Sequence, residues 1–116
     1  MGLLLVLWAF AGQALAAEVR GLGLSQGATG TRAEVQLQGA GSFKTLSLSG
    51  PHRLVLDLPD STAARDLKLP APAGLVTAVR TGQPVPGTFR IVFELAQPVA
   101  ALPVRSEPLP GGARLL

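Results

Sequence analysis

Apolar and polar residues alternate along three stretches of the chain, and this two-residue period constrains the fold more than any other feature. It runs through residues 31–38 (TRAEVQLQ), 53–58 (RLVLDL) and 88–95 (TFRIVFEL). Side chains two positions apart share one face of a strand, so each stretch predicts a strand with one face in a core and the other in water. Gly and Pro punctuate the chain every few residues, which favours short strands and turns over helices.

The remaining segments complete this pattern. Shorter strands are predicted at residues 18–24, 43–48, 75–81 and 101–106, and hairpin turns at residues 39–41 and 50–52. A proline-rich connection, residues 59–74, separates two halves of one domain. Within it, residues 61–69 fit a short helical turn capped by Asp60 or Ser61.

The two halves resemble each other. Four segments of the first half recur in the same order in the second. Val19-Arg20 corresponds to Val79-Arg80, and a glycine-containing turn follows each pair. Residues 31–35 then correspond to residues 88–92, and residues 53–56 to residues 114–116. We interpret this as an internal duplication, which predicts an all-β sandwich of two similar four-stranded sheets. Each half is expected to form one sheet, so that Arg32 and Arg53 lie on one outer face and Arg80 and Arg90 on the other.

The last segment of the second half is shorter than that of the first. The first half continues as RLVLDLP, whereas the second stops at residues 114–116. We therefore expect the last strand to be cut short and the chain to be part of a longer protein. The same alternation assigns the core to Val35, Leu37, Leu54, Leu56, Leu58, Phe89, Ile91 and Phe93.

Residues 1–16 (MGLLLVLWAFAGQALA) predict a signal peptide. The stretch is uncharged and apolar, and Ala14-Leu15-Ala16 fits a small-x-small cleavage pattern, with Ala17 as the mature start. It is too short to span a bilayer, so no membrane span is expected after cleavage. No Lys or Arg precedes it, which leaves the start of the leader open. The domain proper is residues 17–116.

Composition excludes several kinds of chemistry. The chain has no cysteine, so it forms neither disulfides nor thiolate metal sites. His52 is the only histidine, which is too few for a hydrolytic zinc site or a serine nucleophile with an imidazole base. The net charge is only +3, and Phe43 is the one aromatic outside the leader and the core face, so nucleic-acid binding is not expected. The glycine-rich residues 21–27 have one residue too many for a dinucleotide-binding loop, and no helix pattern follows them.

What remains is a polar strand surface. Glu34, Asp57 and Glu94 each share that surface with an arginine, so ion pairing explains them better than a pair of catalytic carboxylates. Gln36 lies on the same surface, whose long donors and acceptors also suit a polymer with amides, hydroxyls and carboxylates. The candidate ligand-binding residues are Arg32, Glu34, Arg53, Asp57, Arg80, Gln83, Arg90 and Glu94.

The order of these motifs resembles a known family. Residues 31–35, 43–48 and 51–58, followed by residues 79–83 and 89–95, are similar to the two halves of the AMIN domain. The resemblance covers residues 18–116 and implies a sandwich of two four-stranded sheets. It further implies a periplasmic, non-catalytic module that binds peptidoglycan and needs no cofactor.

The resemblance leaves two parent proteins open. AMIN domains target zinc-dependent N-acetylmuramoyl-L-alanine amidases to the division septum, where other divisome proteins are potential partners. They also precede the pore-forming region of type IV pilus secretins, where they serve assembly or anchoring. In both cases the chain itself is expected not to be an enzyme, and the residues that follow it would distinguish the two parents.

Overall fold

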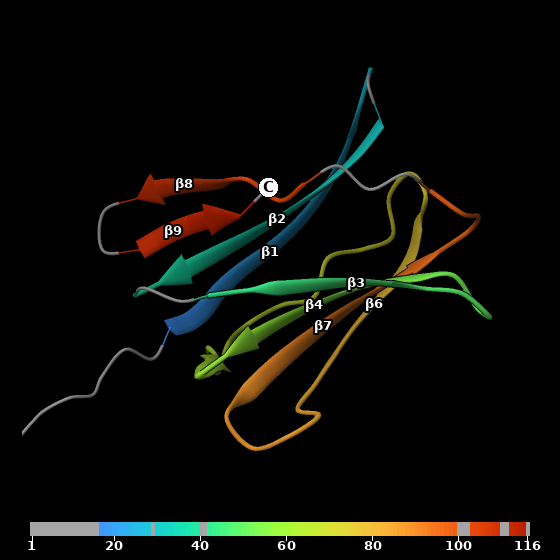
Figure 1. Cartoon of the computed structure of the whole chain (residues 1–116). Helices are drawn as coiled ribbons and strands as arrows, with labels where there is room; N and C mark the ends of the chain where they lie inside the picture. Colours follow the sequence, from blue (N-terminus) through green and yellow to red (C-terminus); the bar gives the residue numbers. More distant parts are fainter. Residues whose placement is uncertain (1–16, 29, 40–41, 100–102, 110–111, 116) are drawn as a thin grey trace, which may run out of the picture.

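The computed structural model describes residues 17–28, 30–39, 42–99, 103–109 and 112–115, which form strands and, within these ranges, no helix (Figure 1). The strands are β1 (Ala17–Gly27), β2 (Gly30–Gln38), β3 (Lys44–Leu48), β4 (Arg53–Pro59), β5 (Ser61–Ala63), β6 (Val76–Gly82), β7 (Thr88–Leu95), β8 (Ser106–Leu109) and β9 (Gly112–Leu115). The predicted leader, residues 1–16, lies outside the described residues.

The strands form two sheets that pack face to face, so the predicted all-β sandwich is confirmed. One sheet has five strands in the order β5-β1-β2-β9-β8, and the other has four in the order β3-β4-β7-β6. All neighbours are antiparallel except β1 and the short β5. The fifth strand, β5, is the one departure from two four-stranded sheets.

The strand order is the one that a duplication produces. Exchanging β1 with β6, β2 with β7, β3 with β8 and β4 with β9 converts the order β1-β2-β9-β8 into β6-β7-β4-β3, which is the four-stranded sheet read backwards. Each half therefore supplies one hairpin to each sheet, and β2 corresponds to β7 as β9 corresponds to β4.

This arrangement corrects the expected placement of the arginines. Arg53, Arg80 and Arg90 all lie on the four-stranded sheet, and Arg32 lies on the five-stranded sheet. The reason is that the apolar sides of β2 and β4 bury against each other, which requires the two hairpins of one half to occupy opposite layers.

Most predicted strand positions agree with the structure, and two predictions are wrong. The turn at residues 50–52 joins β3 to β4 as expected, and part of the turn predicted at residues 39–41 lies outside the described residues. The strand expected at residues 101–106 lies instead at Ser106–Leu109. Where a helical turn was expected at residues 61–69, residues 61–63 form β5, which pairs in parallel with β1, and one hydrogen-bonded turn follows, in which the Leu67 amide donates to the Ala64 carbonyl at 3.1 Å.

The change of layer between β4 and β5 explains why residues 61–63 form a strand and do not begin a helical turn. Asp60 adopts a positive φ of 52°, a conformation that Asp tolerates better than most residues, and the chain turns sharply from one sheet into the other. The backbone amides of Ser61 and Ala64 donate to the carbonyls of Gly87 and Val19, at 3.0 and 2.9 Å. These long-range bonds compete with the local bonds that a helical turn would need.

The core lies between the two sheets and confirms the predicted inward face. Seven of the eight predicted core residues are buried, and Leu54 is partly buried against them. Val19, Val76, Val79 and Leu115 join the same cluster. None of the described segments forms a helix of the length and apolarity needed to cross a membrane.

Candidate ligand-binding faces

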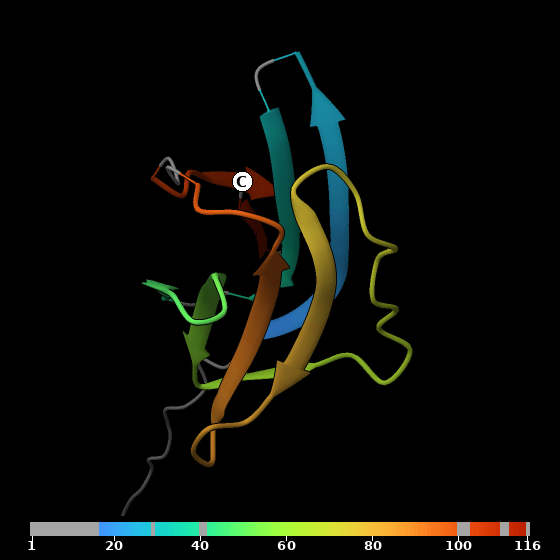
Figure 2. The ribbon, with the colours of Figure 1, turned by 90° about the vertical axis from the view of Figure 1, so that its right-hand side faces the viewer.

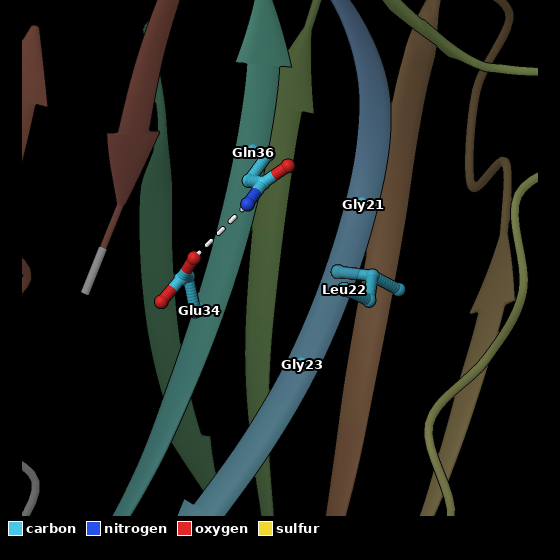
Figure 3. Close-up of a pocket in the computed structure, with 5 residues that line it drawn as sticks. All are labelled: Gly21, Leu22, Gly23, Glu34 and Gln36. Carbon is cyan, nitrogen blue, oxygen red and sulfur yellow. Dashed lines mark hydrogen bonds between the residues drawn. The ribbon is translucent and has the colours of Figure 1, made fainter. Parts of the chain in front are cut away.

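On the outer face of the five-stranded sheet, two glycines of β1 lie at the bottom of a shallow depression, and we call Gly21 and Gly23 the glycine floor. Gly21 and Gly23 of β1 lie beside Gln36 and Glu34 of β2, and together with Leu22 they line a shallow depression (Figure 3). A Cβ atom at Gly23 would meet nothing within 4 Å, so the strand backbone is open to the outside there. A flat ligand can thus approach the backbone closely at this point.

Polar side chains form a connected row beside this floor. Gln36 Nε2 donates to Glu34 Oε2 at 3.1 Å, and Arg114 of β9 lies 3.8 Å from the same carboxylate oxygen. Arg114 Nη2 also donates to Glu107 Oε1 of β8 at 2.7 Å. This hydrogen bond is the main cause that lowers the pKa of Glu107 and raises the pKa of Arg114, so both groups stay charged over the physiological range.

Arg114 and Glu107 were not among the candidate residues derived from the sequence. The repeat contains a signal for Arg114, since Arg114-Leu115 of the second half corresponds to Arg53-Leu54 of the first. Glu107 had no such signal, because it follows the segment that was wrongly predicted to be a strand.

The outer face of the four-stranded sheet is dominated by ion pairs. Asp57 and Arg90 face each other on β4 and β7, and the guanidinium donates two hydrogen bonds to the carboxylate, from Nε at 2.7 Å and from Nη2 at 2.8 Å. On the same face, Arg80 Nε lies 2.5 Å from Glu94 Oε2. The arginines that the sequence offered as ligand contacts are therefore partly engaged within the fold.

The Asp57 carboxylate is held in its charged form. The hydrogen bond from Arg90 is the main cause that lowers the pKa of Asp57, and the positive charges of Arg90 and Lys44 act in the same direction against partial desolvation. The pKa of Arg90 is raised by the same contact. Only 14% of the Asp57 side chain is exposed, so loss of its partner would leave a largely covered charge.

Arg53 differs from the other arginines of this face. Its Nε donates to the Pro51 carbonyl at 3.1 Å, and no ion pair joins it to a carboxylate within the described residues. Although Arg53 lies opposite Glu94 in the sheet, Glu94 pairs with Arg80 instead. Arg53 is thus available for an outside carboxylate.

An apolar row crosses the middle of the same face. Leu46, Val55 and Val92 lie side by side on β3, β4 and β7. The alternation in residues 53–58 puts Val55 on the side opposite Leu54 and Leu56, which was expected to face water. Val55 does lie on that side, but its neighbours cover it and only 2% of it remains exposed. The apolar row separates the Asp57–Arg90 pair from the Arg80–Glu94 pair.

The predicted site residues therefore belong to two opposite faces. Arg32 and Glu34 lie on the five-stranded sheet, whereas Arg53, Asp57, Arg80, Arg90 and Glu94 lie on the four-stranded sheet. Gln83 is exposed immediately after β6. The structure brings Asp57 to Arg90 and Arg80 to Glu94, and it keeps Arg32 and Glu34 away from all four.

The described residues offer binding chemistry and no recognisable reaction centre. No three His, Asp or Glu side chains gather there in a way that would hold a metal ion. His52 lies in the turn before β4, where its carbonyl accepts a 3.0 Å hydrogen bond from the Leu95 amide. What the two faces supply is carboxylates, guanidinium groups, amides and open strand backbone on a rigid sheet.

The fold and the two outer faces define a small all-β sandwich domain with polar sheet surfaces. The model of the AMIN domain family matches residues 23–115, and the chain belongs to this family. The resemblance found in the sequence is thereby confirmed. AMIN domains are non-catalytic peptidoglycan-binding and targeting modules of periplasmic proteins. No curated protein sequence matches the chain significantly.

Proposed function

We propose that this domain binds peptidoglycan in the periplasm and targets a cell-wall N-acetylmuramoyl-L-alanine amidase to the septum during cell division. Residues 1–16 serve as the export leader, and residues 17–116 act as the mature domain. The domain takes no part in the hydrolysis. Its membership of the AMIN family supports the choice of ligand.

The observation that carries the proposal is the glycine floor beside Glu34 and Gln36. Glycan strands present ring faces and acetamido groups, which lie flat only on a surface without protruding side chains. Gly23 provides such a surface, since a Cβ there would meet nothing within 4 Å, whereas the Gln36 side chain lies close to Gly21. The row of Gln36, Glu34 and Arg114 supplies donors and acceptors next to it. We therefore place the glycan on the outer face of the five-stranded sheet.

The opposite face offers a second, charged contact. In the four-stranded sheet Arg80 occupies the position that corresponds to Gly23, so a charged side chain paired with Glu94 stands there in place of a bare glycine. Arg53 keeps donors for the carboxylates of stem peptides on this face. Contacts on two faces let one domain lie between neighbouring strands of the peptidoglycan network.

Sedimentation with purified sacculi tests the binding. The mature domain is expected to sediment with sacculi at low salt, to be partly released at high salt, and to liberate no soluble muropeptides with or without a chelator. Recovery in the supernatant at low salt contradicts the binding. Release of muropeptides contradicts the non-catalytic role.

A pair of glycine variants tests the position of the site. Gly23→Val fills the depression, and Gly27→Val makes the same change further along β1, where a Cβ likewise meets nothing within 4 Å. Val is favourable in strands, so both variants should fold. We expect Gly23→Val to weaken sedimentation at least fivefold and Gly27→Val to leave it unchanged. Equal binding by both places the glycan elsewhere.

Septal targeting has its own readout. A fluorescent fusion of the exported domain should collect at the division site, and the Gly23→Val fusion should spread around the cell envelope. Septal fluorescence that is equally strong for both fusions would show that targeting does not depend on this face.

A further inference from the structure

Among the described residues, the two sheets end in four edge strands, and three of these edges are protected against further pairing. β5 is three residues long, β6 shifts its register between Val76 and Ala78, and β8 contains Pro108, which has no backbone N–H to donate. Short strands, bulges and prolines keep sheet edges from pairing with other chains. The fourth edge strand, β3, has five residues, an unbroken register with β4 and no proline.

Every residue of β3 is exposed, from Lys44 to Leu48. Figure 2 shows the green β3 at the left of its sheet, where the order of strands ends. Leu46 and Leu48 are each 40% exposed, and both lie on the outer face of the sheet, on the same side as Val55 of β4. An edge that lacks protection and carries two exposed leucines can accept a further strand.

Lys44 is the only charged residue of β3, and it does not protect the middle of the edge. It is the first residue of the strand and lies opposite Asp57 of β4. The four positions that follow are uncharged, with leucines on the outer side and the hydroxyls of Thr45 and Ser47 on the inner side. The edge is therefore apolar on one side and hydroxyl-bearing on the other.

This pattern fits a second copy of the same strand. A two-fold axis at Leu46 aligns two β3 strands antiparallel and pairs all five residues of each. Leu46 then lies opposite its own copy, Thr45 opposite Ser47 of the second copy, and Lys44 opposite Leu48 of the second copy. The two Lys44 residues stay about 14 Å apart along the strands, farther than the screening length of about 8 Å at physiological ionic strength.

The apolar row of the outer face supports the same axis. Leu46, Val55 and Val92 lie side by side, and the row ends at the free edge with Leu46, its 40% exposed member. In the paired strands the row continues from Leu46 to Leu46 of the second copy and on to the Val55 beside it. Leu46 thus gains an apolar neighbour on the side that now faces water.

We propose that β3 is a dimerisation edge, at which two copies of this domain pair antiparallel about a two-fold axis at Leu46. Five paired residues make a small interface, so the dimer is weak and reversible and forms where copies are concentrated on a surface. The two four-stranded sheets become one continuous sheet, whose outer face carries Arg53 of both copies next to Leu48. Two joined copies hold a polymer more firmly than one copy does.

Sedimentation equilibrium of the mature domain tests the edge at protein concentrations from about 10 μM to about 1 mM, a range that covers weak association. We expect a monomer–dimer equilibrium. Leu46→Lys brings two like charges together at the axis and should weaken association about tenfold or more. Leu48→Lys faces Lys44 of the second copy and should act in the same direction. Val85→Lys is the matched control, since Val85 is 56% exposed between β6 and β7, and should leave association unchanged.

A mixture of two variants tests the axis. Leu46→Lys mixed with Leu46→Glu should associate more strongly than either variant alone, because opposite charges then meet at the axis. Hydrogen exchange at those β3 amides that point away from β4 should slow as the wild-type concentration rises. Both leucines are exposed, so the variants should melt like wild type when dilute.

Three results would overturn the proposal. The first is a wild-type domain that stays monomeric at every concentration. The second is a dimer that Leu46→Lys and Leu48→Lys leave intact, since it would use another surface. The third is a mixture that associates no better than its components, which would exclude the two-fold axis at Leu46. Peptidoglycan is absent from these measurements, so their failure leaves the proposed function unaffected.

Discussion

The hydroxyl oxygen of Thr31 accepts a 3.0 Å hydrogen bond from the backbone amide of Leu75 and so joins the two sheets at one end of the sandwich. Thr31 lies on β2, and Leu75 immediately precedes β6 in the opposite layer. The neighbouring Gly74 has a φ of 56°, and a Cβ there would collide with the Thr31 side chain. The close approach of the sheets therefore depends on a glycine at position 74 and a hydroxyl at position 31.

Substitutions at this junction should destabilise the fold for two separate reasons. Thr31→Val keeps the shape but removes the acceptor, which should cost about 1–2 kcal/mol because the Leu75 amide is partly buried. Gly74→Ala adds backbone strain to the collision and should cost about 2–3 kcal/mol. Urea denaturation of each variant measures the losses. If Gly74→Ala has wild-type stability, the sheets are not in contact here.

The two phenylalanines at positions 93 and 43 should differ sharply in their effect on stability. Phe93 is 4% exposed within the core cluster, whereas Phe43 is 37% exposed just before β3. Phe93→Ala should lower the free energy of unfolding by about 3–5 kcal/mol, because it leaves a cavity between the sheets. Phe43→Ala is the matched control and should lower it by less than about 1 kcal/mol. Equal losses in chemical denaturation would contradict the assigned core.

The sequence predicted which side of each strand is buried better than it predicted which strands lie next to each other. A two-residue period is enough to place Leu56 and Leu58 inside and Asp57 outside, since a strand has only two sides. The period says nothing about which strands lie side by side, and so Arg80 and Arg90 were assigned to a different sheet from Arg53. The burial of Val55 depends on Leu46 and Val92 from other strands, which a pattern along one strand does not contain.

In the candidate site, too, the sequence revealed what one strand contains and missed what depends on strand pairing. Glu34 was recognised because it alternates with apolar residues on its own strand. Its link to Arg114 follows from the pairing of β2 with β9, and the contact of Arg114 with Glu107 follows from the pairing of β9 with β8. The glycine floor was overlooked because glycine has no side chain that marks a face in the alternating pattern, although residues 18–24 were predicted to form a strand, and both glycines lie within the long β1. These features come from tertiary pairing, and the local pattern does not encode them.

The Asp57–Arg90 pair should make stability depend on pH in the acidic range. Because the pKa of Asp57 is lowered in the folded state, the pair stabilises the fold above the unfolded value near 3.9, and this contribution is lost as the pH falls through the folded pKa. Asp57→Asn should therefore cost about 1–2 kcal/mol at pH 7 and progressively less below about pH 4.

Urea denaturation between pH 7 and pH 3 measures this difference. Arg90→Gln serves as the partner variant, since removing the hydrogen bond should flatten the acidic part of the profile as Asp57→Asn does. A difference between wild type and Asp57→Asn that stays constant over the whole range would mean that the carboxylate is not coupled to Arg90.

Alanine substitutions of Arg53 and Arg90 should have different effects, one on ligand binding and the other on stability, although both residues lie on the same face. From their strand pattern alone, alanine at either position would be expected to weaken binding and leave the melting temperature unchanged. The structure alters the expectation for Arg90, because Arg90→Ala leaves the largely covered Asp57 carboxylate without its partner. The melting temperature of Arg90→Ala should fall by about 4–8 °C or more.

Arg53→Ala should show the opposite behaviour. Its guanidinium forms no ion pair with the described carboxylates, and one bidentate contact to a stem-peptide carboxylate contributes about 1.5–3 kcal/mol when well formed. Sedimentation with sacculi should therefore weaken about tenfold at low salt, while the melting temperature stays within about 2 °C of wild type. Arg53→Lys keeps the charge without the planar fork and should recover only part of the binding. If Arg53→Ala sediments like wild type at every salt concentration, the charged contact on the four-stranded sheet does not exist, and binding rests on the five-stranded face alone.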